Sequence, residues 1–190
     1  MNLYLKLAFV AIGLIIIWLI WTFNRLVIKR NRVEEAWSDI DIQLKRRYNL
    51  IPNLVEIVKA YAKHETQIFT KIAEARSQAL SARTLAQHAA AENSLTAALH
   101  GLFAIAENYP DLKASQNFLQ LQNELSDTED KIQAARRFYN SNVRDFNSAL
   151  QTFPNNLIAK AFGFKEKEFF HLEETKEKEV PSIAGIYRGE

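Results

Sequence analysis

The side chains best suited to chemistry in this sequence are histidines with a glutamate close by. His64 is followed by Glu65, and Glu168 precedes His171 at the Glu-x-x-His spacing found in carboxylate-bridged metal bundles. A di-iron site needs two such pairs and two further glutamates, all facing the interior of one bundle, whereas this sequence holds one pair near its C-terminal end. Solvated side chains are therefore the better account, and we predict no bound metal or other cofactor.

The sequence also lacks the groups that most enzymes need. It has no cysteine, which excludes disulfides, thiolate nucleophiles and cysteine-type zinc sites. It has no His-Glu-x-x-His motif, glycine-rich phosphate loop or nucleophile elbow. We predict a protein that is not an enzyme and has no catalytic residues.

Charged side chains are numerous and mixed in sign. The chain has 24 basic and 22 acidic residues, so no strong field of one sign results, and nucleic acid is not a predicted partner. Most of these side chains lie off the apolar stripe, as on a solvated helix face; the alternative is that some, such as Arg136 with an acidic partner across a bundle, fix helix register. The candidate contacts to a partner or to lipid headgroups are Lys29, Arg30, Arg32, Asp39, Lys45 and Arg46.

The first structural element from the N-terminus is predicted by an uncharged run over residues 7–23. As a helix it spans about 25 Å, and the preceding residues extend it towards the roughly 30 Å of a bilayer core. No small-residue cleavage site follows it, so we predict a signal-anchor helix rather than a cleaved signal peptide or a buried core helix. Basic residues are concentrated after the run, which predicts that the C-terminal side is cytoplasmic.

The rest of the chain is typical of an all-α protein. Only five glycines and four prolines interrupt it, and apolar residues recur at helical spacing. The predicted fold is a single transmembrane helix that continues into a long antiparallel helical bundle. The predicted parts are a short extracytoplasmic N-terminus (1–6), a transmembrane helix (7–28), a cytoplasmic helical bundle (29–163) and a charged C-terminal tail (164–190).

Prolines and polar stretches set the expected helix boundaries. The pattern favours a tight hairpin at Pro52, with a mild kink as the alternative, and a second helix from Pro52 to about Ala79. A bend is expected between residues 77 and 93, at a position that the pattern does not fix. A break is expected at Tyr109-Pro110, followed by a long helix over 112–150 and a short one over 156–162 capped by Gly163. Phe164, Phe169 and Phe170 are expected to hold the start of the tail against the bundle.

Two blocks of this sequence resemble the LemA family of bacterial and archaeal membrane proteins. The first reads RN-x-V-x-x-AWS-x-ID-x-QLKRR-x-x-LIPNLV over residues 30–55. The second begins YP-x-LKA at residue 109 and continues through Asn117-Phe118, Tyr139-Asn140, Phe146-Asn147 and Phe153-Pro154. The resemblance implies one transmembrane helix with a cytoplasmic helical bundle in the bacterial cytoplasmic (inner) membrane, and it implies no established activity.

These observations lead to two functional hypotheses. The first is a non-enzymatic scaffold or adaptor that associates with the lipid bilayer, self-assembles as a homo-oligomer and binds other membrane proteins. The family resemblance makes a membrane metalloprotease one candidate among those partners. The alternative hypothesis is a regulatory or sensory module that modulates a membrane protease or an envelope-stress pathway.

Overall fold

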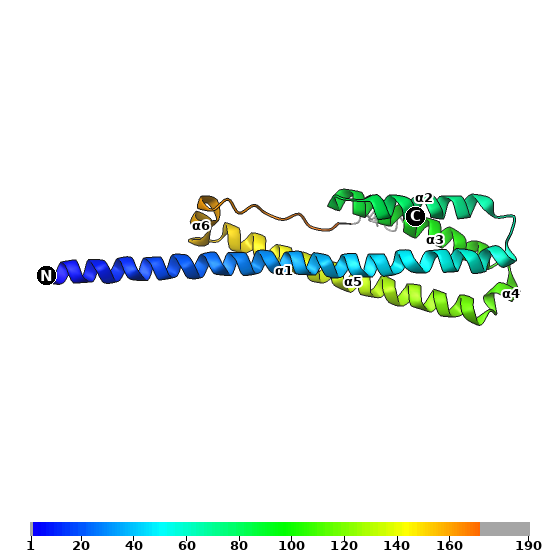
Figure 1. Ribbon diagram of the computed structural model, residues 1–190, viewed down its shortest axis with the longest axis horizontal. Coiled ribbons are helices and arrows are strands. Elements are labelled where there is room, and N and C mark those ends of the chain that lie inside the picture. The colour runs from blue at the N-terminus through cyan, green and yellow to red at the C-terminus, as the bar shows by residue number, and fades with distance from the viewer. Residues whose placement is uncertain (1, 172–190) are drawn as a thin grey trace, which may run out of the picture.

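The computed structural model describes residues 2–171, and these form a long, narrow arrangement of helices (Figure 1). Within that range there is no strand, which confirms the predicted all-α class. Residues 172–190, which make up most of the predicted tail, lie outside the described part. The helices are α1 (Leu3–Tyr61), α2 (Thr66–Ser81), α3 (Leu85–Ala106), α4 (Pro110–Lys113), α5 (Gln116–Gln151) and α6 (Asn155–Ala161).

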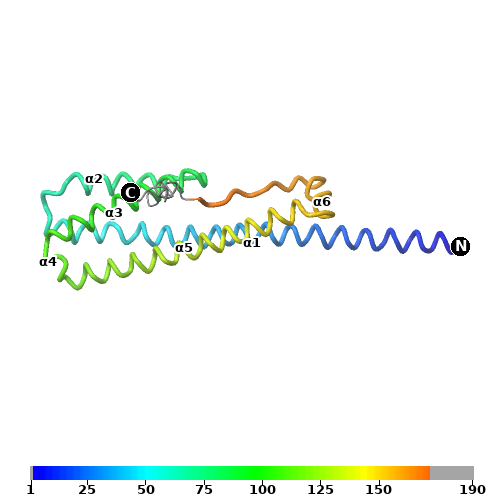
Figure 2. The backbone as a smooth tube through the Cα atoms, turned by 180° about the vertical axis from the view of Figure 1, so that it is seen from behind, coloured from blue at the N-terminus to red at the C-terminus, as the bar shows by residue number. Residues whose placement is uncertain are grey.

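The two longest helices, α1 and α5, form the axis of the bundle. They lie side by side in antiparallel directions, and α5 alone has 36 residues, a length of about 54 Å (Figures 1 and 2). Helices α2 and α3 form a hairpin that covers the half of this pair farther from the N-terminus. The predicted antiparallel bundle is therefore confirmed.

The N-terminal part of α1 projects beyond every other element (Figure 1). It contains one segment long and apolar enough to cross a membrane, and none of that 18-residue window is buried within the protein. This exposure rules out the core-helix alternative, because a core helix would be covered by its neighbours. The large apolar side chains exposed along it include Leu7, Phe9, Val10, Ile12, Leu14, Ile15, Ile16, Ile17, Ile20 and Trp21.

The hairpin predicted at Pro52 is wrong, because α1 continues through Pro52 to Tyr61. A proline within a helix has no N–H to donate to the carbonyl four residues earlier, which here belongs to Tyr48. Arg76 of α2 fills that role, since its Nε donates a hydrogen bond to the Tyr48 carbonyl oxygen at 2.8 Å. A tertiary contact thus compensates for the local defect, and the helix remains unbroken.

The first turn of the bundle lies ten residues later than predicted, between α1 and α2. Ala62, buried beneath the turn, donates its N–H to Val58, and neither glycine nor proline marks the position. The bend expected between residues 77 and 93 lies at 82–84, before α3. There Thr84 and Gln87 form a capping box, in which each side chain accepts a hydrogen bond from the main-chain N–H of the other.

Most of the later boundaries agree with the predictions, but the long helix expected from residue 112 begins only at Gln116, because Leu112 belongs to the separate short helix α4. α3 ends at Ala106 ahead of Tyr109-Pro110, and Pro110 occupies the first turn of the short helix α4. α5 ends at Gln151, and α6 is followed by Gly163 at φ +70°, a left-handed conformation that glycine adopts without strain. The chain then returns along the bundle as an extended segment, residues 164–171, which we call the strap (Figure 1).

A single continuous core connects these helices. The α1 stripe contributes buried residues mostly three or four positions apart, which place them on one helical face. Their principal neighbour is α5, and α2, α4 and α6 make further contacts with α1. The largest fully buried side chains are Phe146, Leu26, Ile40, Leu44, Ile51, Leu54, Ile72, Leu95, Leu102, Leu112, Ile132 and Val33.

Candidate functional site

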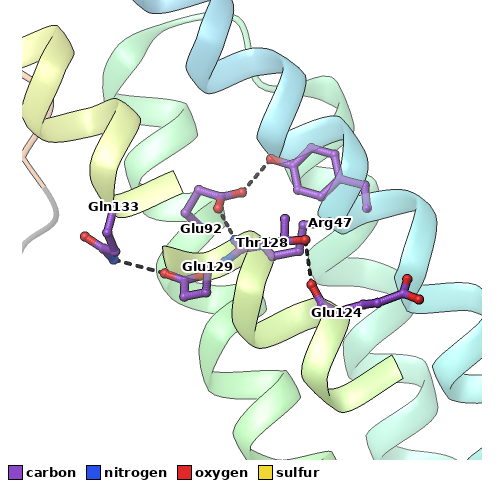
Figure 3. A network of polar contacts seen from close by, with 7 residues as sticks. Arg47, Glu92, Glu124, Thr128, Glu129 and Gln133 are labelled. Atoms are coloured by element: carbon purple, nitrogen blue, oxygen red, sulfur yellow. Dashed lines mark hydrogen bonds and ion pairs between the residues drawn. The ribbon is translucent and has the colours of Figure 1, made fainter. Parts of the chain in front are cut away.

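The most unusual feature of the core is a cluster of three charged side chains from three helices, two of them buried and the third, Glu129, partly exposed (Figure 3). Arg47 of α1, with 3% of its surface exposed, lies between Glu92 of α3 and Glu129 of α5. Its guanidinium group forms an ion pair and a hydrogen bond with each of the two carboxylates. The three residues lie far apart in the sequence, so this charge cluster links three helices at one level of the bundle.

Neutral polar groups complete the charge cluster. The Tyr48 hydroxyl donates a hydrogen bond of 2.5 Å to the second oxygen of Glu92, and Gln133 donates one of 3.0 Å to Glu129. Burial raises the pKa of Tyr48 far above its ordinary value, and the negative charge of Glu92 raises it further. The phenol therefore stays protonated and acts as a fixed donor to Glu92.

The local sequence explains why these charges are buried. Arg47 falls on the same α1 face as Ile40, Leu44 and Ile51, and Glu92 falls on the α3 face that carries Leu95. Helix packing therefore carries both charges inward with their apolar neighbours. Ion pairs of this kind add little net stability, because desolvation offsets the attraction, but loss of one partner leaves an uncompensated buried charge and costs about 3–5 kcal/mol.

A groove between α3 and α5 opens beside the charge cluster. Its volume is about 390 Å³, and its lining includes Arg47 and Glu129 together with Leu99, His100 and Phe103. Within residues 2–171 no group of three or more His, Cys, Asp or Glu side chains could hold a metal ion. The Arg47 charge is directed to carboxylates of the same chain, so this arrangement is suited to fixing helix register rather than to binding an anion.

The second polar feature is a pair of asparagines on α5 that holds the strap. Asn140 donates from Nδ2 to the Phe170 carbonyl at 3.0 Å and accepts from the Phe170 N–H at 2.8 Å. Asn147 makes the same two contacts with Lys167, each at 2.9 Å. Asn140 and Asn147 are seven residues apart on a helix, a rise of about 10.5 Å, and Lys167 and Phe170 are three residues apart on an extended segment, about 10 Å. The distance between the two asparagines therefore matches the distance between the two strap residues that they bind. We call Asn140 and Asn147 the asparagine clamp.

Aromatic side chains fix the end of the strap. Phe170 is buried and lies against Trp37, whose ring also contacts Tyr139 and His88 with centroids 5.7 and 5.3 Å away. The Tyr139 hydroxyl donates a hydrogen bond to the Glu168 carbonyl at 3.0 Å. Burial raises the pKa of Tyr139, and the Glu168 charge raises it further. The prediction that Phe164, Phe169 and Phe170 hold this segment against the bundle is confirmed, because all three contact the core.

Comparison with known proteins connects these features to a family. The family model described as LemA family matches residues 36–184, which is most of the chain. The chain belongs to the LemA family. The matched region contains both the charge cluster and the asparagine clamp, whereas the exposed apolar part of α1 precedes it.

Curated relatives agree with this assignment to the LemA family. Protein LemA of Metamycoplasma hominis is 32% identical over 162 residues, which cover 83% of this chain and 72% of that protein. Magnetosome protein MamQ of Magnetospirillum gryphiswaldense is 25% identical over 196 residues, covering 90% of this chain and 72% of that protein. Neither name denotes an enzyme.

The structure places the six predicted contact residues of this LemA-family protein away from the charge cluster. Arg30, Arg32, Asp39, Lys45 and Arg46 are exposed, and Lys29 is half-buried. Lys45 pairs with Asp41 on the same helix at 2.6 Å, as expected for a solvated face. Contacts of these six residues with a partner or with lipid headgroups remain predictions.

The sequence pattern does not reveal that Arg47, Glu92 and Glu129 form the charge cluster. The charge pattern alone places most charged side chains, Arg47 and Glu129 among them, on solvated helix faces and offers Arg136 as the candidate for a contact across the bundle. In the LemA-family fold Arg47 makes that contact, while the Arg136 guanidinium lies 4.8 Å from the centre of the Phe170 ring. The available signal was position, because Arg47 and Glu92 both lie within apolar stripes where a solvated charge is out of place.

Proposed function

We propose that this LemA-family protein is a membrane-anchored, non-enzymatic scaffold or adaptor that assembles with further copies of itself at the membrane. The observation that carries the proposal is the continuity of α1, which runs for 59 residues from an apolar segment without buried residues into the bundle. A helix of that length spans about 89 Å and has no hinge between its two parts.

The interior of the bundle supports a structural role. Its buried charges are paired with one another, its buried phenol stays protonated, and the strap is held through main-chain groups. These groups serve the fold and leave no activated nucleophile or general base among them. The bundle is therefore suited to presenting surfaces at a fixed distance from the membrane.

Flanking charge supports an orientation in which the bundle is cytoplasmic and α1 crosses the inner membrane once. Lys6 precedes the apolar segment, whereas Arg25, Lys29, Arg30 and Arg32 follow it closely, and such an excess of cations favours the cytoplasmic side. Because the chain has no cysteine, single cysteines introduced on the bundle can test this. They should react with a membrane-impermeant maleimide only after the inner membrane is opened.

Self-assembly is supported by apolar side chains that the bundle leaves on its surface. Ile42 on α1 and Phe138 on α5 are both more than half exposed, beyond the segment that would lie in lipid. Lateral contact between copies would remove such side chains from water. Cysteine cross-linking in intact membranes tests this: F138C and I42C should give covalent dimers, whereas Q78C, on the exposed face of α2, should not. Absence of dimers from both would remove the support for self-assembly.

A further inference from the structure

The corner between α5 and α6 exposes large apolar side chains that the fold does not explain. Phe153, Leu157 and Phe162 have 74%, 60% and 63% of their surfaces exposed, although they lie within ten residues of one another. Apolar groups clustered in this way mark a surface that is covered by a partner or by a membrane. We call these three residues the apolar corner.

The position of the apolar corner along α1 indicates what covers it. The Phe162 ring lies 4.9 Å, centre to centre, from the ring of Phe23, and Phe164 lies 5.8 Å from the same ring. Phe23 is the last apolar residue of the apolar segment of α1 and is followed by Asn24 and Arg25. α6 therefore lies at the level where the exposed apolar segment ends, at the end of the bundle nearest the N-terminus (Figures 1 and 2).

A pocket of about 280 Å³ lies between α1 and α5 beside this corner. Its polar lining combines two cations with hydroxyl and amide groups, and no carboxylate is among its lining residues. Thr22 is buried there, and its hydroxyl oxygen has no hydrogen-bond partner among the described residues. The polar groups that line this pocket are Thr22, Arg25, Lys29, Ser148, Thr152 and Asn155.

The charge of the pocket favours an anion. The C-terminal end of α5 contributes carbonyl groups equivalent to about half a negative charge, which Arg25 and Lys29 together exceed. The Arg25 guanidinium lies 5.3 Å from the centre of the Trp21 ring, and tryptophan is enriched at the boundary between membrane and water. A cationic, hydroxyl-rich pocket at that depth matches the phosphate group of a lipid.

We propose that the apolar corner is a second membrane contact and that the neighbouring pocket binds the phosphate headgroup of an anionic phospholipid. In this arrangement Phe153, Leu157 and Phe162 enter the interfacial region, and Arg25 and Lys29 hold the headgroup beside them. Two contacts at one membrane surface restrict the tilt of the bundle. The inference rests on the membrane anchor of the proposed function and adds a ligand class to it.

Fluorescence quenching tests the depth of the apolar corner. The full chain is reconstituted into vesicles of zwitterionic and anionic phospholipid, with an environment-sensitive label on L157C, on I16C within the apolar segment, or on L80C on exposed α2. A quencher carried on lipid acyl chains should quench labels on I16C and L157C and leave L80C unaffected. If the label on L157C is not quenched, as expected for L80C, the inference is overturned. If the label on I16C is not quenched either, the membrane anchor itself is overturned.

Native mass spectrometry of the detergent-solubilised full chain tests the headgroup pocket. Anionic phospholipid should remain bound to the wild type and be lost from R25Q/K29Q by about fivefold for each charge removed. The matched double variant K71Q/R83Q should retain the lipid, because its two exposed cations lie on the α2–α3 hairpin, which covers the half of the bundle farther from the N-terminus. Equal retention by all three proteins would overturn the pocket assignment. Release of the lipid by excess inorganic phosphate, with phosphate bound in its place, would overturn a lipid ligand in favour of free phosphate.

Discussion

Arg76 donates a hydrogen bond to the main-chain carbonyl of Tyr48, the carbonyl left without its helical partner by Pro52. This contact joins α2 to the C-terminal part of α1 and allows a helix with an internal proline to remain continuous. The continuity of α1 through Pro52 to Tyr61 therefore depends on a side chain from a different helix.

Replacing Arg76 should test this compensation. R76A should destabilise the bundle by about 1–3 kcal/mol, because a carbonyl in a buried part of α1 loses its donor. In a P52A background the restored N–H serves that carbonyl, so the cost of R76A should fall by about 1 kcal/mol. Thermal melting of the four proteins in mild detergent measures the coupling, with K71A as the exposed control on α2. Equal costs in both backgrounds would contradict the assignment.

Removing one partner from the charge cluster should destabilise the protein strongly, whereas replacing a buried ion pair with two apolar side chains should destabilise it little. R47M leaves Glu92 and Glu129 without their cation, and the expected loss of about 3–5 kcal/mol lowers the melting temperature by on the order of 10 °C. R47M/E92L should recover most of that loss, since Glu129 is partly exposed and can be solvated. The neighbouring exposed Arg46 provides the control R46M. A full-sized loss in R46M, or none in R47M, would show that burial of the pair is unimportant.

The asparagine clamp predicts how the strap can be released. In N140D and N147D the Nδ2 donor is replaced by a carboxylate oxygen that faces a main-chain carbonyl, so each variant loses one contact and gains repulsion. Trypsin should then cleave after Lys165 and Lys167 several-fold faster than in the wild type. N123D, on the exposed surface of α5, is the matched control. Unchanged cleavage in N140D/N147D would mean that the aromatic contacts alone hold the strap.

The two buried tyrosines predict a loss of stability at alkaline pH. The pKa values of Tyr48 and Tyr139 are raised above the ordinary 10.0 in the folded protein. Above about pH 10 the unfolded chain releases these protons while the folded chain retains them, so the free energy of unfolding falls by about 1.4 kcal/mol per pH unit for each tyrosine. Below that pH neither group contributes a slope.

Phenylalanine variants isolate this effect. Y48F/Y139F should flatten the decline of melting temperature above pH 10, whatever it does to stability at neutral pH. Y61F, which removes a partly exposed hydroxyl near the end of α1, is the control and should keep the wild-type slope. If the double variant also keeps that slope, other groups are responsible for the alkaline loss.

Local patterns predicted the elements that local chemistry determines. The break at Tyr109-Pro110 and the cap at Gly163 follow from backbone preferences of single residues. Pro52 by itself predicts a hairpin, but the helix continues because the compensating donor is Arg76, 24 residues away in the sequence and beyond the reach of local preferences. The turn at residues 62–65 carries neither glycine nor proline, so its position follows from helix packing.

In the candidate site, too, local sequence patterns predict some features, whereas others depend on contacts between residues far apart in the sequence. The apolar stripes of α1 and α5 were visible as helical periodicity, but the pairing of Arg47 with Glu92 depends on which helices become neighbours. Asn140 and Asn147 belong to the blocks that carried the family resemblance, yet their shared role appears only when an extended strap lies beside them. Periodicity identifies buried faces, whereas the partners of buried polar groups come from tertiary structure.

The central claim is that the chain is a scaffold that assembles at the membrane, and the most direct test is the mass of the particle in its native lipid. Membranes containing the chain at native abundance are extracted into polymer-bounded lipid discs, and single particles are weighed. The account predicts particles that hold several copies of the 21.9 kDa chain, alone or with other membrane proteins. Discs that hold one copy and no other protein would contradict it.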